Sequence, residues 1–256
     1  MASELRTRTV MGIILVLLAL VALIAGGLLF WLLLVVAGVL MQGEWADLTG
    51  VSREQKRMAM FAVSVPLAIL CPLAAGVSWL AGALMMAAFF FVALAGRSIA
   101  LALGVLYICL PVMALLFLRG QGADGLLLAF WALALVWATD IGAYFAGRSI
   151  GGPKLAPLVS PSKTWSGLAG GVLAALLTGF ILYRFAGLPI QLAAASGLLA
   201  VAAQLGDLLE SAMKRRAGVK DSGTILPGHG GVMDRLDGVV VAAPLAAMLF
   251  LVLEAA

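Results

Sequence analysis

Charged residues are scarce in this chain of 256 residues. Only 11% are Asp, Glu, Lys or Arg, and 64% are hydrophobic, whereas a soluble domain is about 25% charged. A single histidine and two cysteines provide neither a Cys/His zinc site nor a disulfide framework. The apolar runs are unbroken rather than alternating, which argues against a transmembrane β-barrel. These shortages exclude an ordinary soluble domain.

Long apolar segments follow one another along the whole sequence. They cover 10–41, 58–75, 77–94, 98–118, 124–146, 166–187, 189–206 and about 236–254. A helix of about 20 apolar residues crosses a bilayer, so 10–41 is too long for one upright span. Gly26 and Gly27 lie near its midpoint, and we divide it there. The sequence predicts an all-α, polytopic membrane protein with about nine transmembrane helices.

The basic residues test this topology, because Lys and Arg prefer cytoplasmic loops. Nine spans with a cytoplasmic N-terminus place 14 of the 16 basic residues on one side and leave Arg119 and Arg184 on the other. The polar loops 147–165 and 207–235 then both face the cytoplasm. We expect an N-terminal helical part, 1–130, that serves as a scaffold or dimer contact, and a C-terminal catalytic part, 131–256.

Polar residues first gather in QLGDLLESAMKRR, 204–216, where an apolar span ends. Asp207, Glu210, Ser211 and Lys214 are spaced i, i+3, i+4 and i+7, so a continuing helix places them on one face. A solvated helix end with a Glu210–Lys214 pair is the plainer alternative. A carboxylate next to a membrane span is costly, which favours a functional role for Asp207.

The stretch KDSGTILPGHGGVMDRLDG, 220–238, is the most polar part of the chain. Its glycines let backbone N–H groups approach a phosphate. With Asp207, three of its aspartates form an acidic cluster suited to a hard cation such as Mg²⁺, bound together with substrate phosphates. The cluster consists of Asp207, Asp221, Asp234 and Asp237, and the surrounding cations are Lys214, Arg215, Arg216, Lys220 and Arg235. His229 has no Cys or His partner for zinc, and we favour a phosphate or metal-shell contact for it.

A third group of polar residues lies in 138–167. Asp140 stands inside an apolar run, where a charge indicates a substrate, metal or helix-pairing role. Ser160 and Lys163 belong to SPSKT, before the next span, and Ser162 or Thr164 could cap that helix. Gly167 and Gly171 are spaced for close helix packing.

The sequence SAMKRRAGVKDSGTILPGHGGVMDRLD, 211–237, resembles the signature of the phosphatidate cytidylyltransferases, or CDP-diacylglycerol synthases. LGDLLES, D-x-x-A-Y-x-x-G-R and SPSKTW are also similar to the family, so the resemblance covers about 135–240. It implies an enzyme of phospholipid biosynthesis that converts CTP and phosphatidic acid to CDP-diacylglycerol and pyrophosphate. The active site would face the cytoplasm from the cell inner membrane.

The resemblance also implies roles for individual residues. The expected catalytic residues are Asp207, Lys214, Asp221, Asp234 and Asp237. Asp207 and Asp234 are the first choice as Mg²⁺ ligands, with Asp221 and Asp237 in support, and a second, monovalent cation such as K⁺ is an open alternative. The expected contacts to CTP and phosphate are Ser160, Lys163, Ser211, Arg215, Lys220, His229, Gly230, Gly231 and Arg235.

Two other functions remain open from the sequence. A secondary transporter would also use intramembrane carboxylates such as Asp140 and Asp207, but here the polar residues cluster at span ends. A CTP-dependent polyprenol kinase, or a cytidylyltransferase for another lipid phosphate, would keep the nucleotide and change the lipid.

The expected partners are CTP and inner-leaflet phosphatidic acid, with no nucleic acid. The sequence leaves the oligomeric state open, with a homodimer as one alternative.

Overall fold

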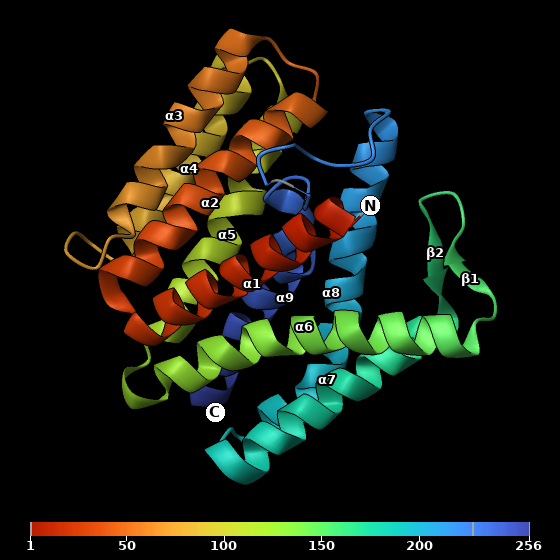
Figure 1. Cartoon of the computed structure of the whole chain (residues 1–256). Helices are drawn as coiled ribbons and strands as arrows, with labels where there is room; N and C mark the ends of the chain where they lie inside the picture. Colours follow the sequence, from red (N-terminus) through yellow and green to blue (C-terminus); the bar gives the residue numbers. More distant parts are fainter. Residues whose placement is uncertain (1, 227, 256) are drawn as a thin grey trace. The chain divides into compact units, whose positions relative to one another are not determined.

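The computed structural model describes residues 2–226 and 228–255, with the backbone alone for residues 2–8. Its elements are α1 (Ala2–Ala25), α2 (Gly27–Leu48), α3 (Arg53–Ile69), α4 (Trp79–Ala95), α5 (Ile99–Arg119), η1 (Gly122–Asp124), α6 (Gly125–Ile150), β1 (Lys154–Ala156), β2 (Ser160–Thr164), α7 (Trp165–Ala186), α8 (Ile190–Arg216) and α9 (Met233–Glu254). Every predicted apolar segment is helical over most of its length (Figure 1). The all-α class is therefore confirmed, and the small β1–β2 hairpin is an addition to it.

Six helical segments in the described chain are long and apolar enough to cross a membrane, judged by length and composition. They are α2, α5, Gly122–Ile150, α7, α8 and α9. Thr9–Ala25 of α1 and the whole of α4 are apolar but shorter. Many large apolar side chains are exposed on these helices, such as Leu94 and Phe185, as expected where lipid is the solvent. The chain is a multi-pass membrane protein.

The break between α1 and α2 lies where the sequence predicts it. Gly26 has φ 62° and ψ −154°, and Gly27 has φ 48°. Residues with a Cβ atom rarely adopt such positive φ angles. The glycine pair thus ends one helix and starts the next. Arg6 and Arg8, on which the predicted N-terminal orientation partly rests, have side chains outside the described residues.

The helices run further into the polar segments than the sequence predicts. The predicted loop 42–57 is helical at both ends, because α2 continues to Leu48 and α3 starts at Arg53. The predicted loop 147–165 contains the end of α6 and the hairpin. The predicted loop 207–235 contains the last ten residues of α8, 207–216, and the start of α9. Helix propensity continues past an apolar segment, so hydropathy alone places the ends too early.

By their contacts, the residues form two compact units: Met1–Leu116 with Arg216–Leu236, and Phe117–Arg215 with Asp237–Ala256. In the first unit α2 packs against α1 and α3, and α3 packs against α4 (Figure 1). The indole of Trp31 donates to the Leu67 carbonyl over 2.9 Å. The expected division into a scaffold 1–130 and a catalytic part 131–256 stays a prediction; the contacts group 216–236 with the N-terminal helices.

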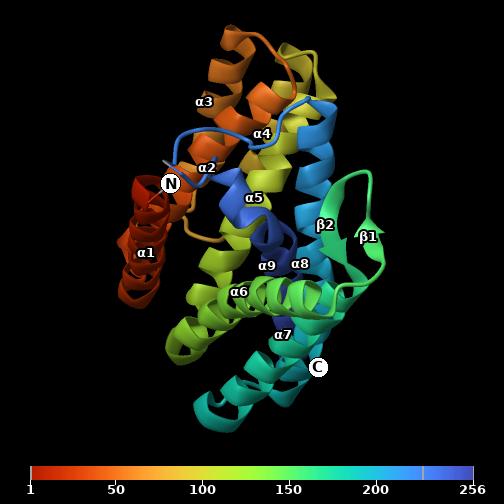
Figure 2. The ribbon, with the colours of Figure 1, turned by 45° about the vertical axis from the view of Figure 1, so that its right-hand side comes forward.

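In the second unit α6 and α7 pack closely where the last turns of α6 meet the first turns of α7 (Figures 1 and 2). A Cβ on Gly171 would lie 2.8 Å from the Thr139 carbonyl oxygen, and one on Gly167 would lie 3.0 Å from that of Ala143. The predicted packing role of both glycines is thus confirmed. Thr164 caps α7 by accepting a hydrogen bond from the Gly167 N–H, and it is buried.

Candidate functional site

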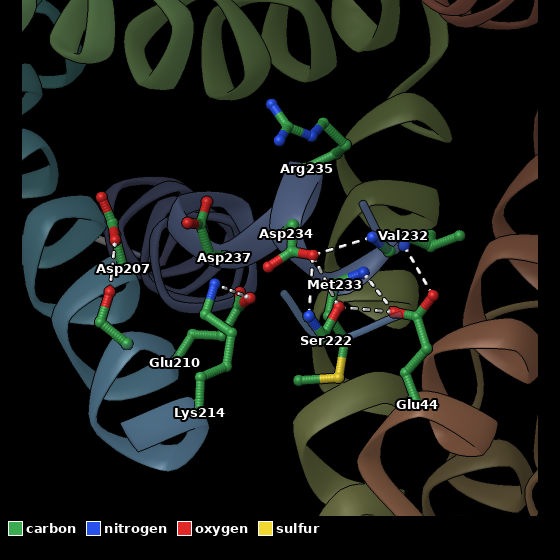
Figure 3. A network of polar contacts seen from close by, with 12 residues as sticks. Glu44, Asp207, Glu210, Lys214, Ser222, Val232, Met233, Asp234, Arg235 and Asp237 are labelled. Atoms are coloured by element: carbon green, nitrogen blue, oxygen red, sulfur yellow. Dashed lines mark hydrogen bonds and ion pairs between the residues drawn. The ribbon is translucent and has the colours of Figure 1, made fainter. Parts of the chain in front are cut away.

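In the first unit, the glycine-rich loop (217–232, of which all but residue 227 is described) is held by a carboxylate from α2. Glu44 is 2% exposed and accepts hydrogen bonds from the Val232 and Met233 N–H groups, each over 2.8 Å, and from the Ser222 hydroxyl over 3.0 Å (Figure 3). The first N–H groups of a helix have no partner within it. Glu44 therefore satisfies the start of α9 from a distant helix, with its negative charge at the positive end of the helix dipole.

Asp234 closes the same loop from the other side. One of its oxygens, Oδ2, accepts from the Ser222 N–H, the Ser222 hydroxyl and the Gly231 N–H over 2.9, 3.0 and 2.8 Å (Figure 3). The predicted metal ligand is thus also an organiser of the loop. Because the Gly231 N–H already donates to Asp234, the backbone that was predicted to contact phosphate is partly engaged within the protein.

The tip of the loop is a tight turn. Leu226 and Gly230 form a backbone bridge, the His229 N–H donates to the Leu226 carbonyl over 2.9 Å, and Gly230 has φ 83°. The His229 imidazole lies against α1, since a Cβ on Gly12 would be 3.3 Å from its Nε2. Its Nδ1 is buried without a hydrogen-bond partner among the described residues. The predicted phosphate contact of His229 stays a prediction.

In the second unit, α8 and β2 bring opposite charges together. The Lys163 ammonium forms an ion pair with Asp207, and the Ser211 hydroxyl donates to the other oxygen of Asp207 over 3.3 Å. The side chains of Lys163 and Asp207 are 15% and 28% exposed. The hairpin therefore places a cation predicted to contact phosphate directly on a carboxylate predicted to bind metal.

The helical face predicted for 204–216 is confirmed, because α8 continues to Arg216. Lys214 donates to Glu210 over 3.0 Å, one turn away. Glu210 is fully buried and the Lys214 side chain is 14% exposed. The Glu210–Lys214 pair of the plainer alternative therefore forms. The same alternative predicted that this part of the helix is solvated, and that prediction is wrong because Glu210 is buried.

A close approach of α8 and α9 places Asp207 beside Asp237. A Cβ on Gly206 would lie only 2.5 Å from the Asp237 carbonyl oxygen, so the two backbones touch there. The Asp237 side chain accepts a hydrogen bond from the Gly238 N–H over 2.7 Å. Figure 3 shows Asp207 and Asp237 on these neighbouring helices. The two carboxylates are therefore attached to neighbouring points of the packed helices α8 and α9.

The remaining predicted residues are divided between the two units. Arg215 donates to the Val159 carbonyl in the turn of the hairpin over 3.4 Å, and Arg235 donates to the His229 carbonyl over 3.1 Å. Ser160 begins β2. Lys220 and Asp221 are exposed, as is Asp140 on α6. These arginines have charged heads near the loops that the sequence predicts to hold phosphate.

The predicted metal ligands fall two in each unit: Asp221 and Asp234 in the first, Asp207 and Asp237 in the second. Within residues 2–226 and 228–255, no group of three or more His, Cys, Asp or Glu side chains lies close enough to hold a metal ion by itself. The set of four aspartates stays a prediction.

The profile of the Cytidylyltransferase family matches residues 6–253. The chain belongs to this family. A protein of Brucella suis biovar 1 (strain 1330), named phosphatidate cytidylyltransferase, is 38% identical over 261 residues, covering 95% of this chain and 92% of the relative. Proteins of the same name from Bacillus subtilis (strain 168) and Haemophilus influenzae are 45% and 46% identical over 145 and 130 residues. These shorter matches cover 56% and 47% of this chain, and 54% and 44% of the relatives.

Sequence reasoning missed Glu44. Glu44 falls in the predicted loop 42–57, where a charged side chain is expected to be solvated. The structure instead buries it in the last two turns of α2. One local signal was available, since the nearest charges on either side are Arg8 and Asp47. A carboxylate at the end of such an apolar run is costly unless it has partners.

Proposed function

We propose that the protein transfers the cytidylyl group of CTP to phosphatidic acid, giving CDP-diacylglycerol and pyrophosphate in phospholipid biosynthesis. The observation that carries this proposal is the match to a relative of that name over 95% of the chain. The family match supports it as well, and it extends beyond the 211–237 signature to the N-terminal helices, because it covers residues 6–253.

The reaction needs positioning and charge neutralisation rather than a nucleophilic side chain. A phosphate oxygen of the lipid attacks the α-phosphorus of CTP, and the bond from that phosphorus to the bridging oxygen of the β-phosphate breaks. The bonding electrons leave with pyrophosphate. A phosphomonoester has a second pKa of about 6, so the attacking oxygen is already ionised near neutral pH. Ionisation removes the need for a strong general base and leaves alignment as the main task.

The cations of the second unit supply much of this neutralisation. Lys163 and Lys214 are both largely buried and each is paired with a carboxylate. Buried, preorganised charges act strongly on a developing negative charge. In the proposed site Lys163 contacts a phosphate of the lipid or of CTP, with Ser160 and Arg215 beside it. Pairing with Asp207 orients the Lys163 ammonium before the substrate binds.

Asp207 and Asp237 fit a magnesium ion by the chemistry of their donors. Mg²⁺ takes oxygen ligands and is commonly held by one or two carboxylates plus substrate phosphates, and these two side chains arise from touching backbones. Asp234 and Asp221 complete the proposed set. When bound, Mg²⁺ would supply charge neutralisation on the phosphates. K⁺ as a second cation is part of the same proposal.

The glycine-rich loop provides the proposed triphosphate contacts. Lys220 in the loop and Arg235 in the first turn of α9 are exposed cations, and His229 has a buried, unpartnered Nδ1 among the described atoms. Arg and Lys suit phosphate oxygens by charge and donor geometry. Gly230, with φ 83°, makes the turn tight, and the Arg235 side chain donates to the His229 carbonyl within it.

The proposed setting is the cell inner membrane, with nine spans, a cytoplasmic N-terminus and the site open to the cytoplasm. The basis is the charge asymmetry, with 14 of 16 basic residues on one side. CTP is a soluble cytoplasmic nucleotide and phosphatidic acid lies in the inner leaflet, so a site at this face reaches both. A homodimer is proposed as the assembly.

The function is tested by giving the purified protein CTP, phosphatidic acid and Mg²⁺. Stoichiometric release of pyrophosphate and formation of CDP-diacylglycerol are expected, with an ATP reaction as control. A kinase acting on a polyprenol would instead release CDP and phosphorylate the alcohol. Absence of pyrophosphate release with CTP under every divalent ion would refute the proposal.

A further inference from the structure

Glu44 uses both carboxylate oxygens to hold the glycine-rich loop. Oε1 accepts from the Val232 N–H, while Oε2 accepts from the Met233 N–H and the Ser222 hydroxyl (Figure 3). A carboxylate that is 2% exposed would be expensive without such partners. The three donors come from the loop and the start of α9, almost 190 residues away in the sequence. Glu44 therefore joins the N-terminal helices to the signature segment.

The helix that carries Glu44 is itself firmly held. The neighbouring Trp45 donates from its indole to the Ala100 carbonyl over 2.8 Å. Its ring lies on Gly104 of α5, where a Cβ would come within 2.6 Å of the indole. Trp45 is 7% exposed. A functional group on such a rigid element can set the position of whatever it binds.

Glu44 and Asp234 meet at one hydroxyl. The Ser222 Oγ lies 3.0 Å from Glu44 Oε2 and 3.0 Å from Asp234 Oδ2, but a serine hydroxyl has a single hydrogen to donate. Gly231 packs into the same corner, since a Cβ there would be 2.6 Å from Glu44 Oε2. Any movement of Glu44 therefore changes the surroundings of Asp234.

We propose that Glu44 is a positioning residue for the cytidylyl transfer. It sets the place of the α9 N-terminus, and through Ser222 it sets the orientation of Asp234. It touches neither substrate nor metal in this proposal. The catalytic part of the inference rests on the proposed function, whereas the anchoring part can be measured without any substrate.

The test compares Glu44→Gln with the matched control Asp47→Asn. Gln keeps the size of Glu44, but its amide nitrogen cannot accept hydrogen bonds. Asp47 lies one turn further on the same helix, with a side chain that is 58% exposed and paired with Lys56 over 2.5 Å. Amide hydrogen exchange is followed by mass spectrometry at Val232 and Met233, without substrate. Exchange there should be about 10- to 100-fold faster in Glu44→Gln, as expected for lost hydrogen bonds to a charged group, and unchanged in Asp47→Asn.

Kinetics then separate positioning from mere stability. We expect Glu44→Gln to lower kcat by about 10- to 100-fold with KM for phosphatidic acid unchanged, and Glu44→Asp to restore part of kcat because it keeps the charge. Ser222→Ala and Glu44→Gln together should cost less than the product of their separate effects. Where Glu44→Gln fails to fold, Glu44→Asp and Ser222→Ala provide the same comparison.

Three results would overturn the inference. Unchanged exchange at Val232 and Met233 would mean that the anchor is not formed. Faster exchange with wild-type kcat would mean that the anchor does not serve catalysis. Multiplicative effects of the two substitutions would mean that Glu44 does not act through Ser222. An unmodified protein inactive with CTP would instead refute the proposed function, while the exchange result would still decide the anchor.

Discussion

Substitution of Gly206 by alanine should move the carboxylates of Asp207 and Asp237 apart, because both lie at the α8–α9 contact. The added Cβ would lie 2.5 Å from the Asp237 carbonyl oxygen, and ordinary contact begins at 3.4 Å. The obstacle is backbone rather than a flexible side chain, so the two helices must part by about 0.9 Å at this point, the difference between these distances. Asp207 and Asp237 flank the contact and would move apart with their helices.

A displacement of about 1 Å at a reacting centre can cost roughly 100-fold in rate, and we expect Gly206→Ala to lose kcat on this scale. Overpacking should lower the free energy of unfolding by only about 1–3 kcal/mol, so the protein remains folded. The assay is pyrophosphate release under saturating CTP, with thermal unfolding in the same detergent.

Gly82→Ala in α4 is the matched control, because a Cβ there meets nothing within 4 Å. Alanine is the better helix former by about 1 kcal/mol, so this variant should keep its activity and its stability. If Gly206→Ala retains more than half of the wild-type kcat, the α8–α9 contact does not set the geometry of the site.

Three further predictions concern the second unit and the metal. Lys163→Ala should lower kcat/KM by about 100-fold or more, because a largely buried cation that contacts phosphate is lost. Lys154→Ala, at an exposed position of β1, should not have this effect, and equal effects in the pyrophosphate assay would contradict the role of Lys163. Glu210→Ala leaves the Lys214 charge largely buried without this partner and should destabilise the fold by about 3–5 kcal/mol, measured by thermal or denaturant unfolding; an unchanged midpoint would show that the pair is not structural. Removal of divalent ions with a chelator should abolish turnover and added Mg²⁺ should restore it, and full activity in the chelator would refute the magnesium proposal.

Local patterns predicted much of the second unit. The spacing of Asp207, Glu210, Ser211 and Lys214 predicted a shared helical face, and both i,i+4 contacts form on it. Such contacts follow from helix geometry alone, so no tertiary information is needed. The burial of Glu210 could not be predicted in the same way, because it depends on which neighbours pack over that face.

Contacts between distant segments were beyond local patterns. Lys163 was predicted to contact phosphate, yet its ion pair with Asp207 depends on a hairpin that apolar periodicity does not reveal. Asp234 was predicted as a metal ligand, and only the folded loop shows that its Oδ2 also accepts from the Ser222 and Gly231 N–H groups and lies 3.0 Å from the Ser222 hydroxyl. The resemblance to a signature names functional positions but not the hydrogen bonds that orient them.

The sequence by itself determined the helical membrane class, the break at Gly26 and the family to which the chain is similar. A bilayer allows few backbone structures, so long apolar runs can be assigned to helices and a glycine pair between them to a helix break. Only the tertiary structure decided that Glu44, at the end of an apolar helix, anchors a loop 178 residues away at Ser222. A long-range hydrogen bond arises from how the helices pack, and packing leaves no periodic mark on the chain.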